Sequence, residues 1–213
     1  MHIRLNTENE NFLTIDGKRA NFLMLDEKMN FIISERKIDV MEYTISNQYL
    51  RAVLKTDKYE YHVLEKPAGV NRIYCIGGDN RRKTLRFNMP YTIMIVKLRY
   101  INGVYKKIGD RLYHSNEPVK KDLSNALWEW GLSNVYDNTY NICWGNTNLP
   151  NIDNQTTYQY IEEFFLSIMN KDLLRNKNID WATMSPDVIH ELDIKQLKRL
   201  SYRLNSVIDS DTF

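Results

Sequence analysis

The chain has 213 residues, and its 29 basic and 27 acidic side chains give a formal net charge of +2. This near-balance offers no electrostatic basis for wrapping nucleic acid or coating a membrane surface. Apolar residues make up 43% and charged residues 26%, with eight glycines and five prolines, which indicates a packed globular protein. No apolar run approaches the roughly 18 residues that a membrane span requires, and the first residues lack a secretory-signal pattern. We therefore expect a cytoplasmic protein without a membrane segment.

Short segments with a β-type pattern occupy the first 120 residues. Apolar and polar residues alternate in them, and Gly, Asn or Asp separates one segment from the next. Residues 38–46 form one such segment, ending near Asn47. The predicted hairpins are 11–25 around Asp16-Gly17, 49–65 around Asp57, 70–87 around Gly77–Asn80 and 91–108 around Asn102-Gly103. Together they predict a largely antiparallel meander.

After residue 120, apolar residues recur every three or four positions, which predicts helices. The predicted helices are 122–130, 156–170, 185–193 and 193–208. Thr156 or Thr157 is placed to cap the second helix, and Ser185 with Pro186 is a typical start for the third. Strands followed by helices predict an α+β protein, with an antiparallel β-meander sheet packed by C-terminal helices.

The sequence offers no motif for a metal or a cofactor. Its four histidines are scattered, no CxxC is present, and no glycine-rich phosphate loop follows a strand. Cys75 lies in the apolar run RIYCIGG, so we expect a buried strand thiol. The basic group at residues 81–86 sits beside a turn, where a solvated hairpin tip is expected and nucleic-acid contact is the alternative.

Cys143 has very different neighbours. It stands among Asn138, Thr139, Asn141 and Gly145, a far more polar setting than the interior of a strand. Partial exposure would let its thiolate act as a nucleophile, with amide or backbone N–H donors stabilising an oxyanion. A structural cysteine buried at the end of a strand is the alternative.

The segment NVYDNTYNICWG, residues 134–145, resembles the active-site segment of ubiquitin-conjugating (E2) enzymes. It is more similar to bacterial and phage E2-like families, including the PRTRC system protein B group, in which a Phe-rich helix follows the cysteine. Here Phe164, Phe165 and Ser167 occupy the corresponding places, and Pro90 resembles the proline that precedes a core strand. The resemblance covers roughly residues 85–172.

This resemblance implies an E2-like core in residues 71–213, with residues 1–70 as an additional N-terminal β-rich extension. It implies that Cys143 forms a thioester with a ubiquitin-like modifier and that Asn134 holds the loop or stabilises the oxyanion. Tyr136, Trp144 and Gly145 would line the groove for the modifier's tail; capping the sheet edge is the alternative role for the two aromatic rings. The implied partners are an E1-like adenylating enzyme and a ubiquitin-like protein in a bacterial or phage-infected cell, without a cofactor or metal. The oligomeric state stays open.

The segment also departs from the family pattern. Leu132-Ser133 replaces the usual His-Pro pair, and the interval from Asn134 to Cys143 is one residue longer than expected. The loop glycine is replaced by residues 137–139, where Asn138 can adopt a positive φ. These differences favour the second hypothesis, a catalytically inactive E2-fold interaction module or phage accessory protein.

Overall fold

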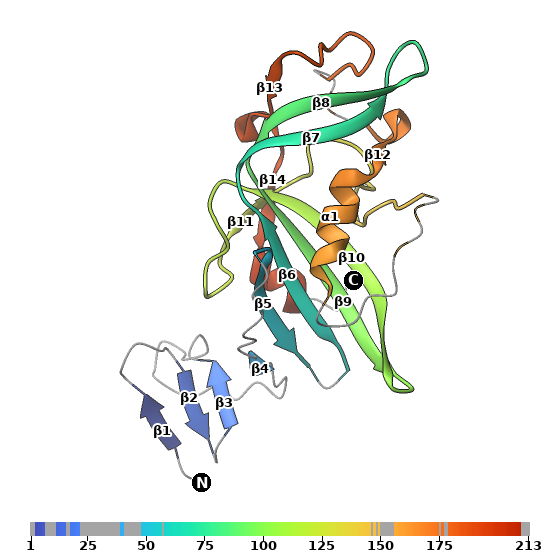
Figure 1. Ribbon diagram of the computed structural model, residues 1–213. Helices are drawn as coiled ribbons and strands as arrows, with labels where there is room; N and C mark the ends of the chain where they lie inside the picture. The colour runs from blue at the N-terminus through green and yellow to red at the C-terminus, as the bar shows by residue number, and fades with distance from the viewer. Residues whose placement is uncertain are drawn as a thin grey trace.

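A computed structural model describes residues 3–6, 12–15, 18–21, 39–40, 48–56, 58–145, 147, 149, 156–174, 176 and 179–209. Within these residues the protein is a mixed α+β structure dominated by strands (Figure 1). Near the N-terminus, β1 (Ile3–Asn6), β2 (Phe12–Ile15) and β3 (Lys18–Asn21) form an antiparallel three-stranded sheet. The pairing of β2 with β3 confirms the first predicted hairpin, whose Asp16-Gly17 turn lies outside the described residues.

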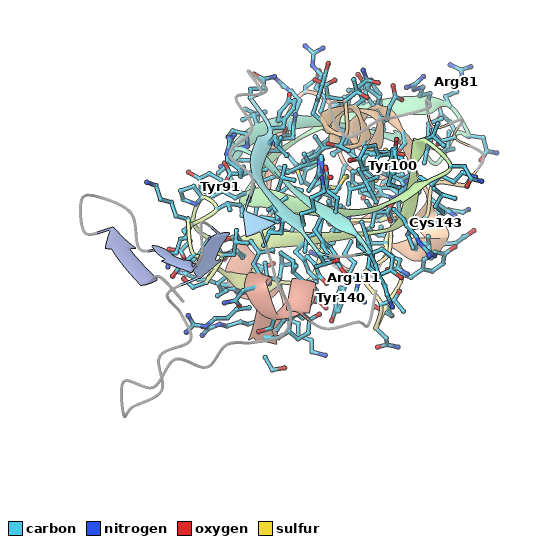
Figure 2. The ribbon with its side chains drawn as sticks, turned by 90° about the horizontal axis from the view of Figure 1, so that it is seen from below. Arg81, Tyr91, Tyr100, Arg111, Tyr140 and Cys143 are labelled. Carbon is cyan, nitrogen blue, oxygen red and sulfur yellow. The ribbon has the colours of Figure 1, made fainter. Side chains whose placement is uncertain are left out.

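A seven-stranded antiparallel sheet forms the centre of the molecule. Its order is β14 (Arg199–Arg203), β11 (Ala126–Trp128), β10 (Val104–Ser115), β9 (Tyr91–Ile101), β6 (Glu60–Lys66), β5 (Leu50–Lys55) and β4 (Asp39–Val40). Figure 2 labels Tyr91 and Tyr100 toward opposite ends of β9. Alternate residues of β9 enter two different hydrophobic cores, because both faces of the sheet are covered. Met94 and Val96 enter one core, while Ile93 and Ile95 enter the other.

A smaller four-stranded sheet extends from the first. It has the order β12 (Ile168–Met169), β7 (Gly69–Ile76), β8 (Arg82–Met89) and β13 (Ile189–Glu191). β7 and β8 form an antiparallel hairpin, and β12 and β13 join its two edges in parallel. One face of this sheet is buried through Ile73, Cys75, Leu85 and Phe87. The burial predicted for Cys75 is confirmed.

Helix α1 (Tyr158–Leu166) belongs to the core that this buried face shares with the seven-stranded sheet. Its apolar face buries Tyr160, Ile161, Phe164 and Phe165, as the sequence predicts. The helix is shorter than predicted, since Ile168 and Met169 pair with β7 as strand β12. Short helix α2 (Leu204–Asp209) contributes to the other core.

Most predicted hairpins are confirmed where they can be described. β7–β8 and β9–β10 form as expected, and Asn102 and Gly103 take φ values of 52° and 85° at the second turn. β5 and β6 pair across a turn that includes Asp57, which lies outside the described residues together with Asn47. Residues 60–66, in the expected extension, pair along β9 and are therefore part of the central sheet.

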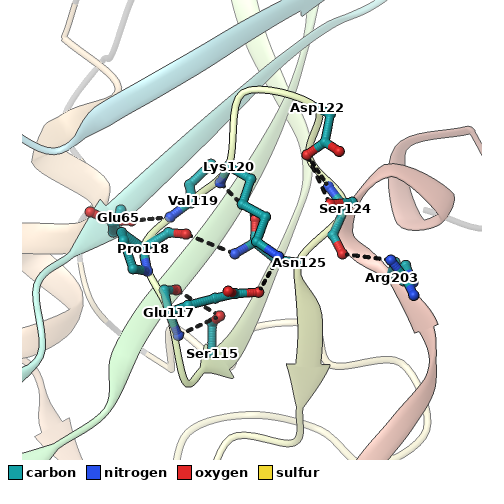
Figure 3. A network of polar contacts seen from close by, with 10 residues as sticks. All are labelled: Glu65, Ser115, Glu117, Pro118, Val119, Lys120, Asp122, Ser124, Asn125 and Arg203. Atoms are coloured by element: carbon teal, nitrogen blue, oxygen red, sulfur yellow. Dashed lines mark hydrogen bonds and ion pairs between the residues drawn. The ribbon is translucent and has the colours of Figure 1, made fainter. Parts of the chain in front are cut away.

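The helix predicted at 122–130 is wrong. Asp122 accepts hydrogen bonds from the backbone N–H and hydroxyl of Ser124 (3.1 and 2.8 Å), which closes a turn (Figure 3). Leu123 has φ +54°, which a right-handed helix cannot contain. Buried Asn125 joins the backbone of Pro118 and Lys120. The chain then continues as β11, because the edge of β10 supplies a pairing partner.

The helix predicted at 185–193 is also wrong, and the one predicted at 193–208 is confirmed only where α2 covers its last residues. The first region forms β13, and the second passes through short helix η3 (Ile194–Gln196), β14 and α2. Leu197, Leu200 and Leu204 are nonetheless buried, so the spacing of leucines marked buried positions without specifying a helix. Pairing with β8 and β11 outweighs the local helical pattern. No helix in the described part of the chain is long and apolar enough to cross a membrane.

Candidate functional site: the Cys143 hairpin

Residues 134–143 form a short hairpin, called here the Cys143 hairpin. Val135 and Ile142 make an antiparallel bridge, and the N–H of Tyr136 donates to the carbonyl of Asn141 (2.9 Å). At the base, the N–H of Cys143 donates to the backbone carbonyl of Asn134 (2.8 Å). The cysteine is therefore fixed opposite the asparagine that the sequence pairs with it.

Unusual backbone geometry shapes this hairpin. Asn134, Asn138 and Tyr140 have φ values of 64°, 62° and 59°, and Gly145 just after it has 54°. Asn and Gly tolerate this left-handed region better than other residues do. The positive φ expected for Asn138 is confirmed.

Asp110 attaches the hairpin to strand β10. Its carboxylate accepts hydrogen bonds from the backbone N–H of Ile142 (3.1 Å) and the indole N–H of Trp144 (2.6 Å), and it pairs with Lys107. The register of β10 shifts between Lys107 and Gly109, so a bulge immediately precedes this carboxylate. Asp110 is only 4% exposed, and it orders both sides of the cysteine.

Cys143 itself is half-buried, in contrast to fully buried Cys75. The Tyr136 hydroxyl lies 3.2 Å from its sulfur, and Tyr136 is 47% exposed. This hydrogen bond raises the pKa of the Tyr136 hydroxyl, while burial raises the pKa of the Cys75 thiol. Figure 2 shows Cys143 toward the rim of the molecule, well away from Arg81 at the β7–β8 tip. The structure thus brings Tyr136 and Cys143 together at a partly exposed place.

The structure does not bring the Asn134 carboxamide to the cysteine. Its Nδ2 donates to the carbonyl of Ile168 (3.0 Å), and its Oδ1 accepts from the N–H of Asn170 (2.8 Å). Asn134 is 4% exposed, and neighbouring Ser133 donates to the carbonyl of Asn170. In this arrangement Asn134 joins the hairpin to the chain that follows α1, which agrees with loop holding rather than with an oxyanion donor.

Trp144 and Gly145 follow the cysteine. The Trp144 ring lies 5.9 Å from the Tyr160 ring and 6.1 Å from the Phe164 ring, and the Lys107 ammonium lies 4.9 Å from its centroid. The half-buried Trp144 ring thus packs against α1 and leaves part of its surface exposed. Gly145 is exposed, at the turn where the N–H of Thr147 donates to the carbonyl of Trp144 (3.0 Å).

Sequence reasoning missed Asp110. A single aspartate in KKIGDRL is not distinctive, and its partners in the hairpin are more than 30 positions away. The available signal was its inward position: it shares a strand face with Leu112 and His114, both fully buried.

A second group of hydrogen-bonded polar side chains is fully buried. The imidazole of His62 bonds the hydroxyl of Thr157 and the carboxylate of Glu60, both at 2.7 Å. All three are at most 2% exposed, so no substrate could reach the hydroxyl in this state. Thr157 stands at the predicted N-cap position of α1 but makes no cap hydrogen bond, because its hydroxyl is bound to His62. This group joins the start of α1 to β6.

Two side chains of the basic group at residues 81–86 make hydrogen bonds within the protein. Lys83 donates to the carbonyl of Trp181 (3.2 Å), and Arg86 donates to the carbonyl of Asp187 (2.6 Å). Among the residues that the structure describes, no group of three or more His, Cys, Asp or Glu side chains could hold a metal ion.

Comparisons of the whole chain with models of protein families, with curated proteins and with solved structures found no match. The geometry of the Cys143 hairpin and the resemblance of its sequence are therefore the grounds for assigning a function.

Proposed function

We propose that the protein is an E2-like acyl carrier, which holds the C-terminal carboxyl group of a ubiquitin-like protein as a thioester on Cys143 and transfers it to an amine. The observation that carries the proposal is a half-buried thiol beside a tyrosine hydroxyl, on a hairpin anchored at both ends. A structural cysteine would need neither the partial exposure nor the hydroxyl partner.

The proposed chemistry requires two exchanges at one carbonyl carbon. The Cys143 thiolate attacks the thioester that the modifier forms with an adenylating enzyme, so a new C–S bond forms and the enzyme's thiolate leaves. An acceptor amine then attacks the Cys143 thioester, a C–N bond forms, the Cys143 thiolate leaves and the amine loses a proton to solvent. Tyr136 is placed to donate a hydrogen bond to the sulfur at both stages.

The order of elements supports an E2-like core as the finer description of the fold. An antiparallel meander comes first, the cysteine segment follows, and a Phe-rich helix then packs against the sheet. In the proposal Asn134 is a positioning residue, since its backbone carbonyl holds Cys143 and its side chain holds the chain after α1.

A charging reaction tests the proposal. The protein is incubated with ATP, a candidate adenylating enzyme and a ubiquitin-like protein, and the products are analysed by mass spectrometry with and without a thiol reductant. We expect an adduct that reductant removes, that Cys143→Ala abolishes, and that Cys143→Ser converts into a reductant-resistant ester. Cys75→Ala is the matched control and should charge normally. An adduct that survives Cys143→Ala would remove the assignment.

A non-catalytic interaction module is the second candidate. The observation that favours it is the Asn134 carboxamide, which is 4% exposed and bound away from the thiol. Iodoacetamide labelling of the native protein separates the two. An acyl carrier requires Cys143 to react much faster than Cys75, whereas equal and slow labelling would favour the module.

A further inference from the structure

The four-stranded sheet has one covered face and one open face. Ile73 and Cys75 point into the core, so the alternate residues of β7 point outward with their cross-strand neighbours. This outer face carries four exposed aliphatic side chains, Val70, Ile76, Ile168 and Ile189, which are 39–55% exposed. Isolated exposed aliphatic residues are ordinary, but four on one face of one sheet indicate a contact surface.

Three arginines share this face. The strand register places Arg72 directly opposite Arg86, and the Arg82 guanidinium lies 4.6 Å from the centroid of the Tyr74 ring. Like charges opposite each other on neighbouring strands destabilise a sheet, and the carbonyl of Asp187, which accepts from Arg86, accounts for only one of the two guanidinium groups. Glu191 is the one acidic side chain on the outward positions of these four strands, and Asn88 donates to it (2.9 Å). The face is therefore positively charged overall.

A cleft of about 340 Å³ lies at the border of this face. Arg72 and Tyr74 line it from β7, and Phe165 and Leu166 line it from α1. Leu166 is 54% exposed, and the Lys66 ammonium lies over the Phe165 ring at 4.7 Å from its centroid. Lys66, Asn71 and Glu162 complete the lining, so the cleft has room for an aliphatic side chain between two cationic groups and one carboxylate.

These features select among possible ligands. Binding of a second copy through the same face would bring arginines against arginines. Single-stranded nucleic acid prefers aromatic platforms, whereas this face offers one tyrosine among aliphatic residues. Arginine and tyrosine are enriched at the centre of protein interfaces, and this face combines them with exposed aliphatic side chains.

We propose that the outer face of the four-stranded sheet docks an acidic segment of a partner protein. Carboxylates of the partner meet Arg72, Arg82 and Arg86, and an aliphatic side chain enters the cleft beside Leu166. The surface is independent of the Cys143 chemistry, so it can be tested whether or not the protein carries an acyl group.

The test is selection of a phage-displayed library of random 16-residue peptides on the full-length protein. We expect the selected peptides to be rich in Asp and Glu around a Leu or Ile. Their synthetic forms should bind more weakly as salt rises, and at least about tenfold more weakly to the Arg72→Glu/Arg86→Glu variant. The matched control is Arg99→Glu/Lys106→Glu, which makes the same charge change at another exposed cross-strand pair and should bind normally.

The single variant Arg72→Glu distinguishes a loss of binding from misfolding. It creates a favourable cross-strand pair with Arg86, so its urea midpoint should be at least that of the native protein, while its peptide affinity falls. The proposal is overturned if selection yields no acidic peptides, or if both double variants bind them equally. It is also overturned if oligouridine, anionic lipid vesicles or a second copy of the chain, rather than the peptides, shows the dependence on Arg72 and Arg86.

Discussion

Replacing Asp110 with alanine removes the buried carboxylate that attaches the Cys143 hairpin to β10. The backbone N–H of Ile142 and the indole N–H of Trp144 then lose their acceptor. A buried donor left without a partner costs about 1–3 kcal/mol. Lys107 can turn to water because its side chain is 21% exposed, so it adds little. We expect Asp110→Ala to destabilise the hairpin by about 2–4 kcal/mol.

Two measurements follow this effect. Urea unfolding reports the global free energy, and iodoacetamide labelling of Cys143 reports local opening of the hairpin. If the hairpin opens alone, about 2 kcal/mol corresponds to a roughly 30-fold increase in the opened fraction, and labelling of Cys143 speeds up accordingly. Cys75 should label as slowly as before, because it is fully buried on β7, outside the hairpin that Asp110 holds.

Asp79→Ala is the control, since Asp79 is an exposed aspartate whose carboxylate bonds only within the β7–β8 turn. It should change stability by no more than about 0.5 kcal/mol. If Asp110→Ala changes neither the unfolding free energy by more than this nor the labelling rate of Cys143, then the carboxylate does not hold the hairpin.

Three further substitutions test other contacts. Tyr136→Phe removes the hydroxyl donor to the Cys143 sulfur, so iodoacetamide labelling at neutral pH should slow by a factor on the order of two to three, with no change in the urea midpoint. Burial lowers the pKa of His114 from its usual value near 6.5 to about 3. As the pH falls below about 6.5, His114 therefore takes up a proton in the unfolded chain but stays neutral in the folded protein. The free energy of unfolding then decreases by up to about 1.4 kcal/mol per pH unit until the pH reaches about 3. His114→Phe keeps a ring at this site and should flatten the pH dependence of the unfolding free energy over that range. Thr157→Val leaves a buried nitrogen of His62 without its hydroxyl partner and should cost about 1–3 kcal/mol in urea unfolding.

Each substitution has a control. For Tyr136→Phe it is Tyr100→Phe, an exposed tyrosine on the β9–β10 hairpin, which should leave labelling unchanged. His190→Gln should keep the acid sensitivity that His114→Phe removes. Thr139→Val, in the exposed turn of the Cys143 hairpin, should cost little. An equal response of any substitution and its control would contradict the corresponding contact.

The hairpins could be predicted because their signals are local. An Asn-Gly pair between alternating segments specifies the β9–β10 turn without help from the rest of the chain. The apolar run around Cys75 likewise predicts burial, and the polar setting of Cys143 agrees with its partial exposure. The aromatic face of α1 was also readable, since all its buried residues follow helical spacing.

The missed features depend on contacts between distant segments. Residues 185–208 contain helical spacing, yet parallel pairing with β8 and antiparallel pairing with β11 give them strands. Of the two roles expected for Asn134, the oxyanion role required its side chain at the thiol, but the carbonyl of Ile168 and the N–H of Asn170 offer it buried partners. Which acceptor a buried amide chooses is decided by the tertiary structure and cannot be derived from spacing.

The β7–β8 hairpin is made early in the chain, but the strands on its two edges come from much later residues. Asn88 and Glu191, which close one edge, are 103 positions apart. While the ribosome is still making the second half of the chain, both edges present unpaired backbone groups. Such long-range closure slows folding, and a nascent hairpin with open edges can pair with other chains. Truncation before β12 should therefore yield an aggregating product rather than a smaller folded protein.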